Sequence, residues 1–303
     1  MESAHILTPQ RHFEPLGRDV SRLVLGTMLL SDAGADVLDE YVRLGGNAID
    51  TARVYGDGAA EQALGAWLER RPGLREQLVI ASKGAHPAGD RKRVTPAEIE
   101  RDLRASIELL GGPIDLYLLH RDDPSVAVGT IVECMNALRE AGLVRAFGVS
   151  NWTTPRIDEA NAWAAANGLD GFCVSSQHLS LAGQNEEQWA DTRSANDPEV
   201  HAWHERTQMP LLAWSAQARG YFFGRSGAEV MRVYDNAANR ERRRRAQQLG
   251  ERLGRTTAQV ALAWVLHQPF PVHAAFGANT VDQLREAFGA LEVDPAELGA
   301  LTA

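Results

Sequence analysis

The chain alternates short apolar runs with longer segments of helical periodicity, and it does so eight times. The runs have the length of strands, and the segments between them repeat their apolar residues every three or four positions. Regular alternation of strand and helix calls for a parallel sheet. The expected strands cover residues 23–27, 47–50, 78–83, 114–119, 144–149, 172–176, 210–214 and 272–276.

Eight such units favour one closed barrel over two domains. A length of 303 residues suits a (β/α)8 barrel of typical size, and no Ser/Gly-rich linker divides the chain. Before the first run, residues 12–20 fit a hairpin around 16–19. The expected fold is therefore α/β, a single (β/α)8 TIM barrel with an N-terminal β-hairpin, with residues 1–303 as one domain.

Several helices have recognisable starts. Thr95-Pro96-Ala97-Glu98 predicts a capping box with proline at the first helical position, and Thr154-Pro155 opens another helix. Thr256 and Thr280 are expected to begin the last two helices. Gly56-Asp57-Gly58 starts like a dinucleotide fingerprint, but it lacks the third glycine and the preceding long strand. Its glycines are expected to permit the turn into a helix over 59–70.

The composition excludes several classes of protein. A net charge of −9 argues against general nucleic-acid binding, and the basic run at 240–245 is expected to be the solvated face of a helix. No apolar stretch approaches the roughly 18 residues of a membrane helix, and the first residues lack signal-peptide features. Two cysteines and no Cys or His cluster with ligand spacing predict neither disulfides nor a metal. The expected location is the cytoplasm.

Four reactive residues stand at or just past the ends of apolar runs: Asp50, Tyr55, Lys83 and His120. Each alone has an ordinary structural reading, as a helix cap, a packing residue, a snorkelling side chain or a core histidine. Together they fall at the ends of the second, third and fourth strands of a barrel, the face that carries active sites in this architecture. We therefore expect the four side chains to share one pocket.

These side chains are equipped to move a proton beside a carbonyl. A free tyrosine has a pKa near 10, and a nearby ammonium favours phenolate, so Lys83 is expected to lower the pKa of Tyr55. Asp50 holds Lys83 charged and in place, and a neutral His120 orients the substrate oxygen. No side chain supplies a hydride, which must come from a cofactor.

Three blocks of sequence carry a resemblance to a known family. Ile49 to Gly56 resembles the first signature of the aldo-keto reductases, and residues 114–120 and 148–152 resemble two more. The resemblance covers roughly residues 12–295. It implies a (β/α)8 barrel that binds NADP(H) across the carboxyl ends of the strands and reduces aldehydes or ketones, or oxidises the alcohols.

The resemblance also implies roles for single residues. Tyr55 matches the general acid, Lys83 and Asp50 its ion pair, and His120 the orienting histidine. Ser150, Asn151 and Gln177 match the side chains that hold the nicotinamide carboxamide, and Trp214 matches the ring that stacks on the nicotinamide. The implied cofactor-binding residues are Gly26, Thr27, Met28, Asp50, Ser150, Asn151, Gln177, Trp214, Ser215, Ala216, Gln217, Arg219, Gly220, Gly277, Asn279, Thr280, Gln283 and Glu286. The implied substrate-binding residues are Tyr55, His120, Trp152 and Trp189.

The loop expected to hold the adenosine phosphate departs from the family pattern. Many members place Lys or Arg opposite the 2′-phosphate, where this chain has Gly277, Asn279, Thr280 and Gln283. Amides, hydroxyls and a helix N-terminus can also bind a phosphate. NADP(H) remains the expected cofactor and NAD(H) the alternative, with weaker discrimination between them.

The expected function is an NAD(P)(H)-dependent oxidoreductase that acts on a small carbonyl or alcohol. The alternative is a cofactor-bound regulatory subunit with little turnover, because fold alone does not prove catalysis. The intact set of four reactive residues favours the enzyme.

Overall fold

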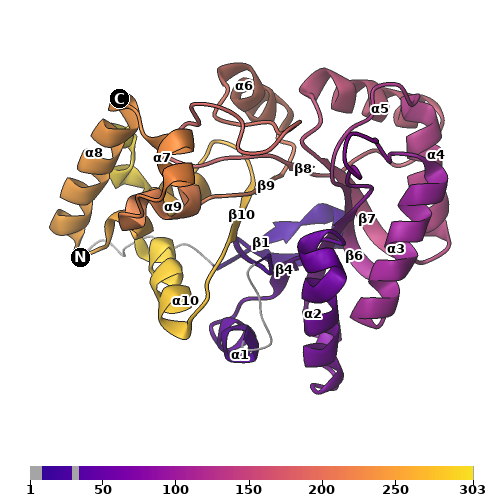
Figure 1. Cartoon of the computed structure of the whole chain (residues 1–303), viewed down its shortest axis with the longest axis horizontal. Coiled ribbons are helices and arrows are strands. Elements are labelled where there is room, and N and C mark those ends of the chain that lie inside the picture. The colour runs from indigo at the N-terminus through magenta and orange to yellow at the C-terminus, as the bar shows by residue number, and fades with distance from the viewer. Residues whose placement is uncertain (1–8, 29–33, 303) are drawn as a thin grey trace.

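The structure is a computed structural model that describes residues 9–28 and 34–302. Eight parallel strands of the described chain close into a barrel in the order β10-β3-β4-β5-β6-β7-β8-β9, surrounded by helices (Figure 1). The strands are β3 (Leu23–Gly26), β4 (Ala48–Asp50), β5 (Val79–Gly84), β6 (Ile114–Leu119), β7 (Val144–Ser150), β8 (Ser175–Ser176), β9 (Leu211–Ala213) and β10 (Val272–Phe276). The predicted (β/α)8 barrel is confirmed.

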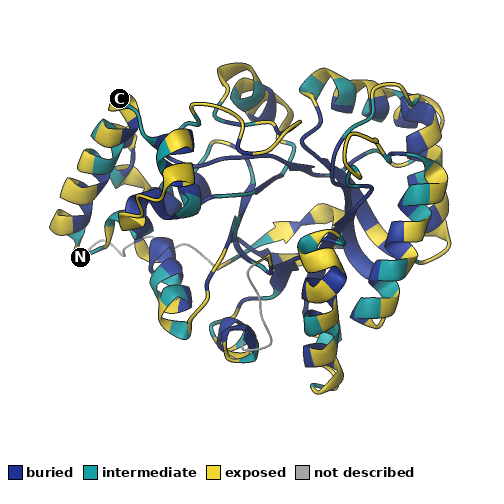
Figure 2. Ribbon diagram, in the orientation of Figure 1, coloured by how far each residue is buried: buried dark blue, intermediate teal, exposed yellow. Residues whose placement is uncertain are grey.

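Helices cover the outside of the barrel. They are α1 (Ala35–Arg43), α2 (Ala59–Glu69), α3 (Pro96–Leu110), α4 (Val128–Glu140), α5 (Thr154–Ala166), α6 (Pro198–Thr207), α7 (Ala228–Tyr234), α8 (Ala237–Leu253), α9 (Thr257–Leu266) and α10 (Val281–Phe288). Most helices bury one face and expose the other, and the strands of the barrel are largely buried (Figure 2). No helix in the described ranges is long and apolar enough to cross a membrane.

An N-terminal hairpin closes one end of the barrel. It pairs β1 (Gln10–Phe13) with β2 (Arg18–Ser21), as predicted, through a turn in which Gly17 has a φ of 59°. Its side chains Phe13 and Val20 join the apolar cluster inside the barrel, together with residues such as Leu116 and Leu212. The strands finish at the opposite end of the barrel, the face that carries active sites in this architecture.

The helix starts follow the predictions with one exception. Thr256 and Gln259 form a capping box at α9, and the Thr280 side chain caps α10. The capping box predicted at Thr95 is wrong, because Thr95 makes no side-chain cap bond. Its partner Glu98 instead forms ion pairs with three arginines: Arg91, Arg93 and Arg101.

Two other predictions concern the length of strand β8 and the exposure of the basic run in α8. Strand β8 is shorter than the predicted 172–176, although the backbone of Cys173 and Val174 still bonds to β7. The basic run of α8 lies on the partly exposed face of that helix, where Arg244 and Arg245 pair with Glu241, as expected.

Candidate active site

The barrel brings the four reactive residues to one mouth. Asp50 is the last residue of β4, Lys83 lies near the end of β5, and His120 directly follows β6. Tyr55 begins the short 3-10 turn η3 (Tyr55–Gly58) that leads from β4 into α2. Gly58 has a φ of 94°, a conformation open to glycine, and it allows the chain to turn at once into the helix.

Lys83 is the centre of this group. Its Nζ lies 2.6 and 2.7 Å from the two carboxylate oxygens of Asp50 and 2.9 Å from the carbonyl oxygen of Thr51. The same Nζ lies 3.3 Å from the hydroxyl oxygen of Tyr55. Asp50 and Lys83 are both buried, so the ammonium is held by three oxygens and directed at the phenol. The predicted partnership of these residues is confirmed.

The pKa values of Asp50 and Lys83 are both raised, which favours the neutral form of Asp50 but the charged form of Lys83. Burial raises the pKa of Asp50 despite the attraction of Lys83. Burial lowers the pKa of Lys83, but Asp50 and Tyr55 together overcome it and leave that pKa raised. We take the pair as ionised, because Nζ contacts both carboxylate oxygens at distances typical of a charge-assisted bond.

The prediction that the pKa of Tyr55 is lowered is wrong. Burial raises that pKa, and Lys83 lowers it by less than burial raises it, so the net direction is upward. Sequence spacing revealed the ammonium but not the loss of solvent around the phenol. Tyr55 therefore remains a protonated phenol across neutral pH, with its hydrogen-bonding partner already in place.

His120 is a neutral imidazole beside Tyr55. Burial lowers its pKa well below the usual value, and the charges of Lys83 and Arg121 lower it further. Its ring stands 6.0 Å from that of Tyr55, at a near-perpendicular 79°. A neutral imidazole can donate or accept one hydrogen bond through each nitrogen. This protonation state agrees with the role expected for His120.

Four predicted nicotinamide residues come together at the ends of β7, β8 and β9. The side-chain oxygen of Asn151 accepts bonds from the Trp214 indole at 3.2 Å and from the Arg193 backbone at 3.1 Å. The Asn151 amide nitrogen donates to Ser150 Oγ at 2.9 Å. Gln177 donates through Nε2 to the Trp152 carbonyl at 3.0 Å.

Unpartnered polar atoms just past the strand ends of β3 and β8 fit a polar ligand, and that of Gln177 fits a carboxamide. Within the described residues, Gln177 Oε1 and Thr27 Oγ1 are buried without a hydrogen-bond partner. Buried polar atoms without partners are costly, and a ligand amide can satisfy an acceptor such as Gln177 Oε1. A side chain at Gly26 would stand 3.3 Å from the carbonyl oxygen of Phe276, so this strand end packs closely against its neighbour.

The segment from Ser215 to Gly220 forms a tight loop at the same mouth. Ser215, Ala218 and Arg219 have left-handed φ angles of 52°, 45° and 52°, and Gly220 has a φ of 90°. Ala216 and Gln217 lie between them in this turn, which leads into η5 (Ala218–Phe223). The guanidinium of Arg219 pairs with Glu229 at 2.8 Å and lies 5.8 Å from the ring centre of Trp189.

The predicted adenosine loop lies at the N-terminus of α10. Gly277, Asn279 and Thr280 are exposed. Gln283 accepts a bond from the Asn279 backbone at 2.8 Å, one residue before the cap, rather than completing a capping box with Thr280. Two charged residues of α10, Arg285 and Glu286, form hydrogen bonds with residues outside this loop. Arg285 donates to Glu40 at 2.7 Å, and Glu286 accepts from the Thr256 hydroxyl at 2.9 Å.

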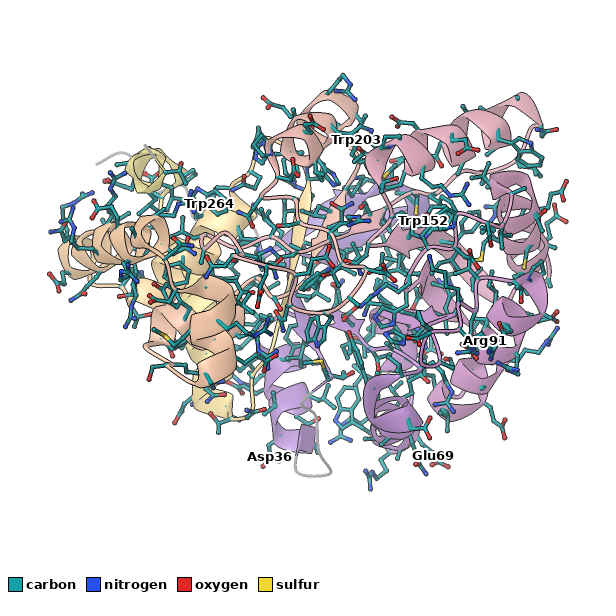
Figure 3. All side chains as sticks on the ribbon, turned by 45° about the horizontal axis from the view of Figure 1, so that its top comes forward. Asp36, Glu69, Arg91, Trp152, Trp203 and Trp264 are labelled. Carbon is teal, nitrogen blue, oxygen red and sulfur yellow. The ribbon has the colours of Figure 1, made fainter. Side chains whose placement is uncertain are left out.

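The residues predicted to touch the substrate occupy different positions. Trp189 is 39% exposed and lies 5.6 Å from Trp214, centre to centre, so these two rings form one aromatic wall. Met28, which is predicted to bind the cofactor, is also exposed. Trp152, labelled in Figure 3, is completely buried, and its indole donates to the Arg121 carbonyl. Its ring packs edge-on against that of Phe172, with the ring centres 5.2 Å apart.

Sequence reasoning missed three residues near the reactive group. His86 follows β5, and its ring lies 4.8 Å from that of His120. Arg121 follows His120 and is buried. Glu61 of α2 lies behind β5, where it accepts from Ser82 at 2.6 Å. Their positions just after strand ends were visible for His86 and Arg121, but nothing in the sequence placed Glu61 behind the strand.

Comparison with known proteins gives the family. The model of the aldo/keto reductase family matches residues 22–303. Norsolorinic acid reductase stcV of Emericella nidulans is 28% identical over 95% of this chain and 79% of its own length. The 6-dehydroglucose reductase of Agrobacterium fabrum is 27% identical over 91% of this chain and 90% of its own.

A solved structure shows the same fold. The thermostable aldo-keto reductase Tm1743, in complex with the inhibitor epalrestat, superposes with a TM-score of 0.76 at 22% identity. The match covers 97% of this chain and 99% of the other. The chain belongs to the aldo/keto reductase family and is an oxidoreductase.

Proposed function

We propose that this protein reduces an aldehyde or ketone with NADP(H), or oxidises the corresponding alcohol, with Tyr55 as the general acid or base. The observation that carries the proposal is the contact chain from Asp50 through Lys83 to the Tyr55 hydroxyl, beside a neutral His120. This group combines a proton donor, a charge next to it and an orienting donor at one opening.

Each residue has a distinct part in the reduction. The substrate oxygen lies between the Tyr55 hydroxyl and the His120 ring, which orients it by hydrogen bonding. As the oxygen gains negative charge, the Tyr55 hydroxyl gives it a proton, and the adjacent Lys83 ammonium stabilises the phenolate that remains. Asp50 keeps that ammonium charged and fixed, so its position costs no reorganisation during the reaction.

The reduced nicotinamide, when bound, supplies the hydride. The residues proposed to hold it are Ser150, Asn151 and Gln177 at the carboxamide and Trp214 at the ring. The free acceptor of Gln177 supports this assignment. We propose that residues 215–220 hold the pyrophosphate and that the residues from Gly277 to Glu286 hold the adenosine end. NADP(H) is our first choice and NAD(H) the alternative, because no Lys or Arg stands at positions 277–283.

The same residues also support a proposal for the substrate and the cellular location. The partner is a small carbonyl or alcohol, admitted beside the aromatic wall of Trp189 and Trp214. We propose that residues 1–303 act as one barrel domain in the cytoplasm, where the free thiols of Cys134 and Cys173 remain reduced.

Turnover is the direct test of this proposal. The purified protein is titrated with NADPH and NADH by fluorescence, and a panel of aldehydes and ketones is then assayed with the preferred cofactor. Cofactor oxidation with formation of the alcohol supports the enzyme. Tight cofactor binding without turnover of any carbonyl supports the regulatory subunit and contradicts the proposal.

A further inference from the structure

Arg121 is a buried cation with an unused donor at the candidate active site. It directly follows His120 at the end of β6, and its side chain is 6% exposed in total. Its Nε donates to the carbonyl of Ala190 at 3.2 Å, and its Nη1 donates to the carbonyl of His120 at 2.9 Å. Nη2 has no hydrogen bond or ion pair with any residue in the described ranges.

Nothing charged within contact distance balances this guanidinium in the described part of the chain. Two carboxylates act on it through space, those of Asp191 and Glu187 in the long segment between β8 and α6, and neither forms an ion pair with it. Glu187 is engaged with Arg193 at 3.3 Å. Burial lowers the pKa of Arg121, yet a guanidinium stays charged in proteins. A buried charge held only by neutral carbonyls is costly unless a counter-ion joins it.

The charge of Arg121 reaches the reacting groups. It lowers the pKa of both Tyr55 and His120, and it lowers that of His86, whose ring lies against His120. Arg121 is also the chain neighbour of His120 and donates to its carbonyl oxygen, so a group bound by Nη2 lies beside a carbonyl held by the His120 ring. Guanidinium groups bind carboxylates through pairs of directed N–H bonds, and Nη2 is free to make such a bond.

We propose that Arg121 binds a carboxylate carried by the substrate, so that the preferred substrates are aldehydes or ketones bearing an anionic group near the carbonyl. This inference rests on the proposed carbonyl reduction and adds its substrate class. The backbone bonds of Arg121 hold the guanidinium in place beforehand, so binding the anion requires little ordering of the side chain.

A matched pair of substrates tests the inference. 4-Carboxybenzaldehyde carries the anion, and 4-carbamoylbenzaldehyde is its neutral isostere. The value of kcat/KM is measured for both with saturating cofactor, in the wild type and in Arg121→Met, Arg121→Lys and Arg193→Met. The electronic difference between the two aldehydes is the same in every variant, so the change in their ratio isolates the contribution of Arg121.

The expected result is a wild-type preference for the carboxylate that Arg121→Met removes. The carboxylate-to-amide ratio should fall roughly 10- to 100-fold, mainly through KM, because a bond to a charged group is lost. Arg121→Lys keeps the positive charge but lacks the paired N–H donors of a guanidinium, and it should retain part of the preference. Arg193→Met removes an exposed cation from the neighbouring loop and releases Glu187 from its ion pair, so it should change the ratio far less than Arg121→Met does.

Three outcomes overturn the inference. The first is equal kcat/KM for both aldehydes in the wild type. The second is an equal loss of kcat/KM for both aldehydes in Arg121→Met, and the third is the same change of ratio in Arg193→Met.

A second measurement covers the case in which Arg121→Met fails to fold. Calorimetry compares the binding of benzoate and benzamide to the wild type with saturating NADP⁺, and equal affinities contradict a carboxylate site. Turnover of the amide without carboxylate preference rejects this inference alone, whereas no turnover of any carbonyl rejects the proposed function.

Discussion

The ammonium of Lys83 lies closer to Asp50 than to Tyr55, at 2.6 Å from a carboxylate oxygen against 3.3 Å from the phenol oxygen. Asp50 therefore fixes the position of the charge, and the Tyr55 hydroxyl approaches a cation that is already bound. The phenol itself is kept protonated by burial, because its pKa is raised. In the proposed mechanism the charge next to it matters most when the proton leaves, since phenolate then forms beside Lys83.

Lys83→Met should reduce both turnover and stability. The variant removes the charge that stabilises phenolate, so the pKa of Tyr55 should rise further and the reduction rate should fall by roughly 10²-fold or more. It also leaves Asp50 buried without its partner, which should cost about 3–5 kcal/mol in the free energy of unfolding. Steady-state kinetics and chemical denaturation at pH 7 measure the two effects.

The double variant Asp50→Asn with Lys83→Met separates these effects. Removing both charges should restore part of the stability lost in the single variant, because no isolated carboxylate remains. Turnover should stay low, since the ammonium is still absent. Recovery of activity in the double variant would remove Lys83 from the mechanism.

Cofactor preference should be modest. The proposed position of the 2′-phosphate, at the N-terminus of α10, offers the exposed Asn279 and Thr280, and Arg285 is engaged with Glu40. We expect NADPH to bind better than NADH by less than about a hundredfold, roughly 2.7 kcal/mol. Asn279→Arg should widen the gap through a charge-assisted contact, and the gain should shrink as salt rises. Fluorescence titration at two ionic strengths checks both statements.

A native preference of a thousandfold or more would contradict this expectation. It would mean that a cation reaches the phosphate from outside the loop. Arg225 is the first to test, because it is exposed and forms no ion pair among the described residues, while Arg219 pairs with Glu229.

The barrel and the reactive group could be predicted because strand ends are readable in sequence. Asp50, Lys83 and His120 close apolar runs, and parallel strands that share a barrel end at one mouth. The direction in which the pKa of Tyr55 shifts could not be predicted, because the shift depends on how much solvent the folded chain removes from around the phenol. The failed capping box at Thr95 has a similar cause, since distant arginines compete for Glu98.

Residues that act across the fold were also beyond sequence reasoning. Ser82 points out of the barrel toward Glu61 of α2, and only the packing of that helix reveals the contact. Nothing in the sequence singles out His178 as a contact of the candidate site. In the structure its ring lies 5.2 Å from that of Trp214, and its nitrogens lie 2.9 Å from Ser194 Oγ and 3.2 Å from Tyr234 Oη.

Buried His178 should make the fold sensitive to acid. Burial lowers its pKa from 6.5 to about 3, so between these values the unfolded chain holds a proton that the folded chain does not. The free energy of unfolding must then fall as pH falls, by roughly 1.4 kcal/mol per pH unit from this residue. The contribution is fully present above pH 6.5 and is lost as pH drops toward about 3.

His178→Gln removes this titration while keeping a hydrogen-bonding side chain. Denaturant unfolding of both proteins across the acid range should give a shallower pH dependence for the variant. His204 and His273, whose pKa values are lowered to about 4 by burial, titrate in both proteins and provide the common background. Parallel slopes would show that His178 does not titrate as described.

The central claim is that Tyr55 gives the proton to the substrate oxygen, and Tyr55→Phe tests it most directly. The variant keeps the ring beside His120 and removes only the hydroxyl that lies next to Lys83. Cofactor affinity, measured by fluorescence, should be unchanged, while the rate of carbonyl reduction under conditions where hydride transfer is rate-limiting should fall roughly 10²- to 10⁴-fold. A variant that keeps more than about half of the wild-type rate would show that another group supplies the proton.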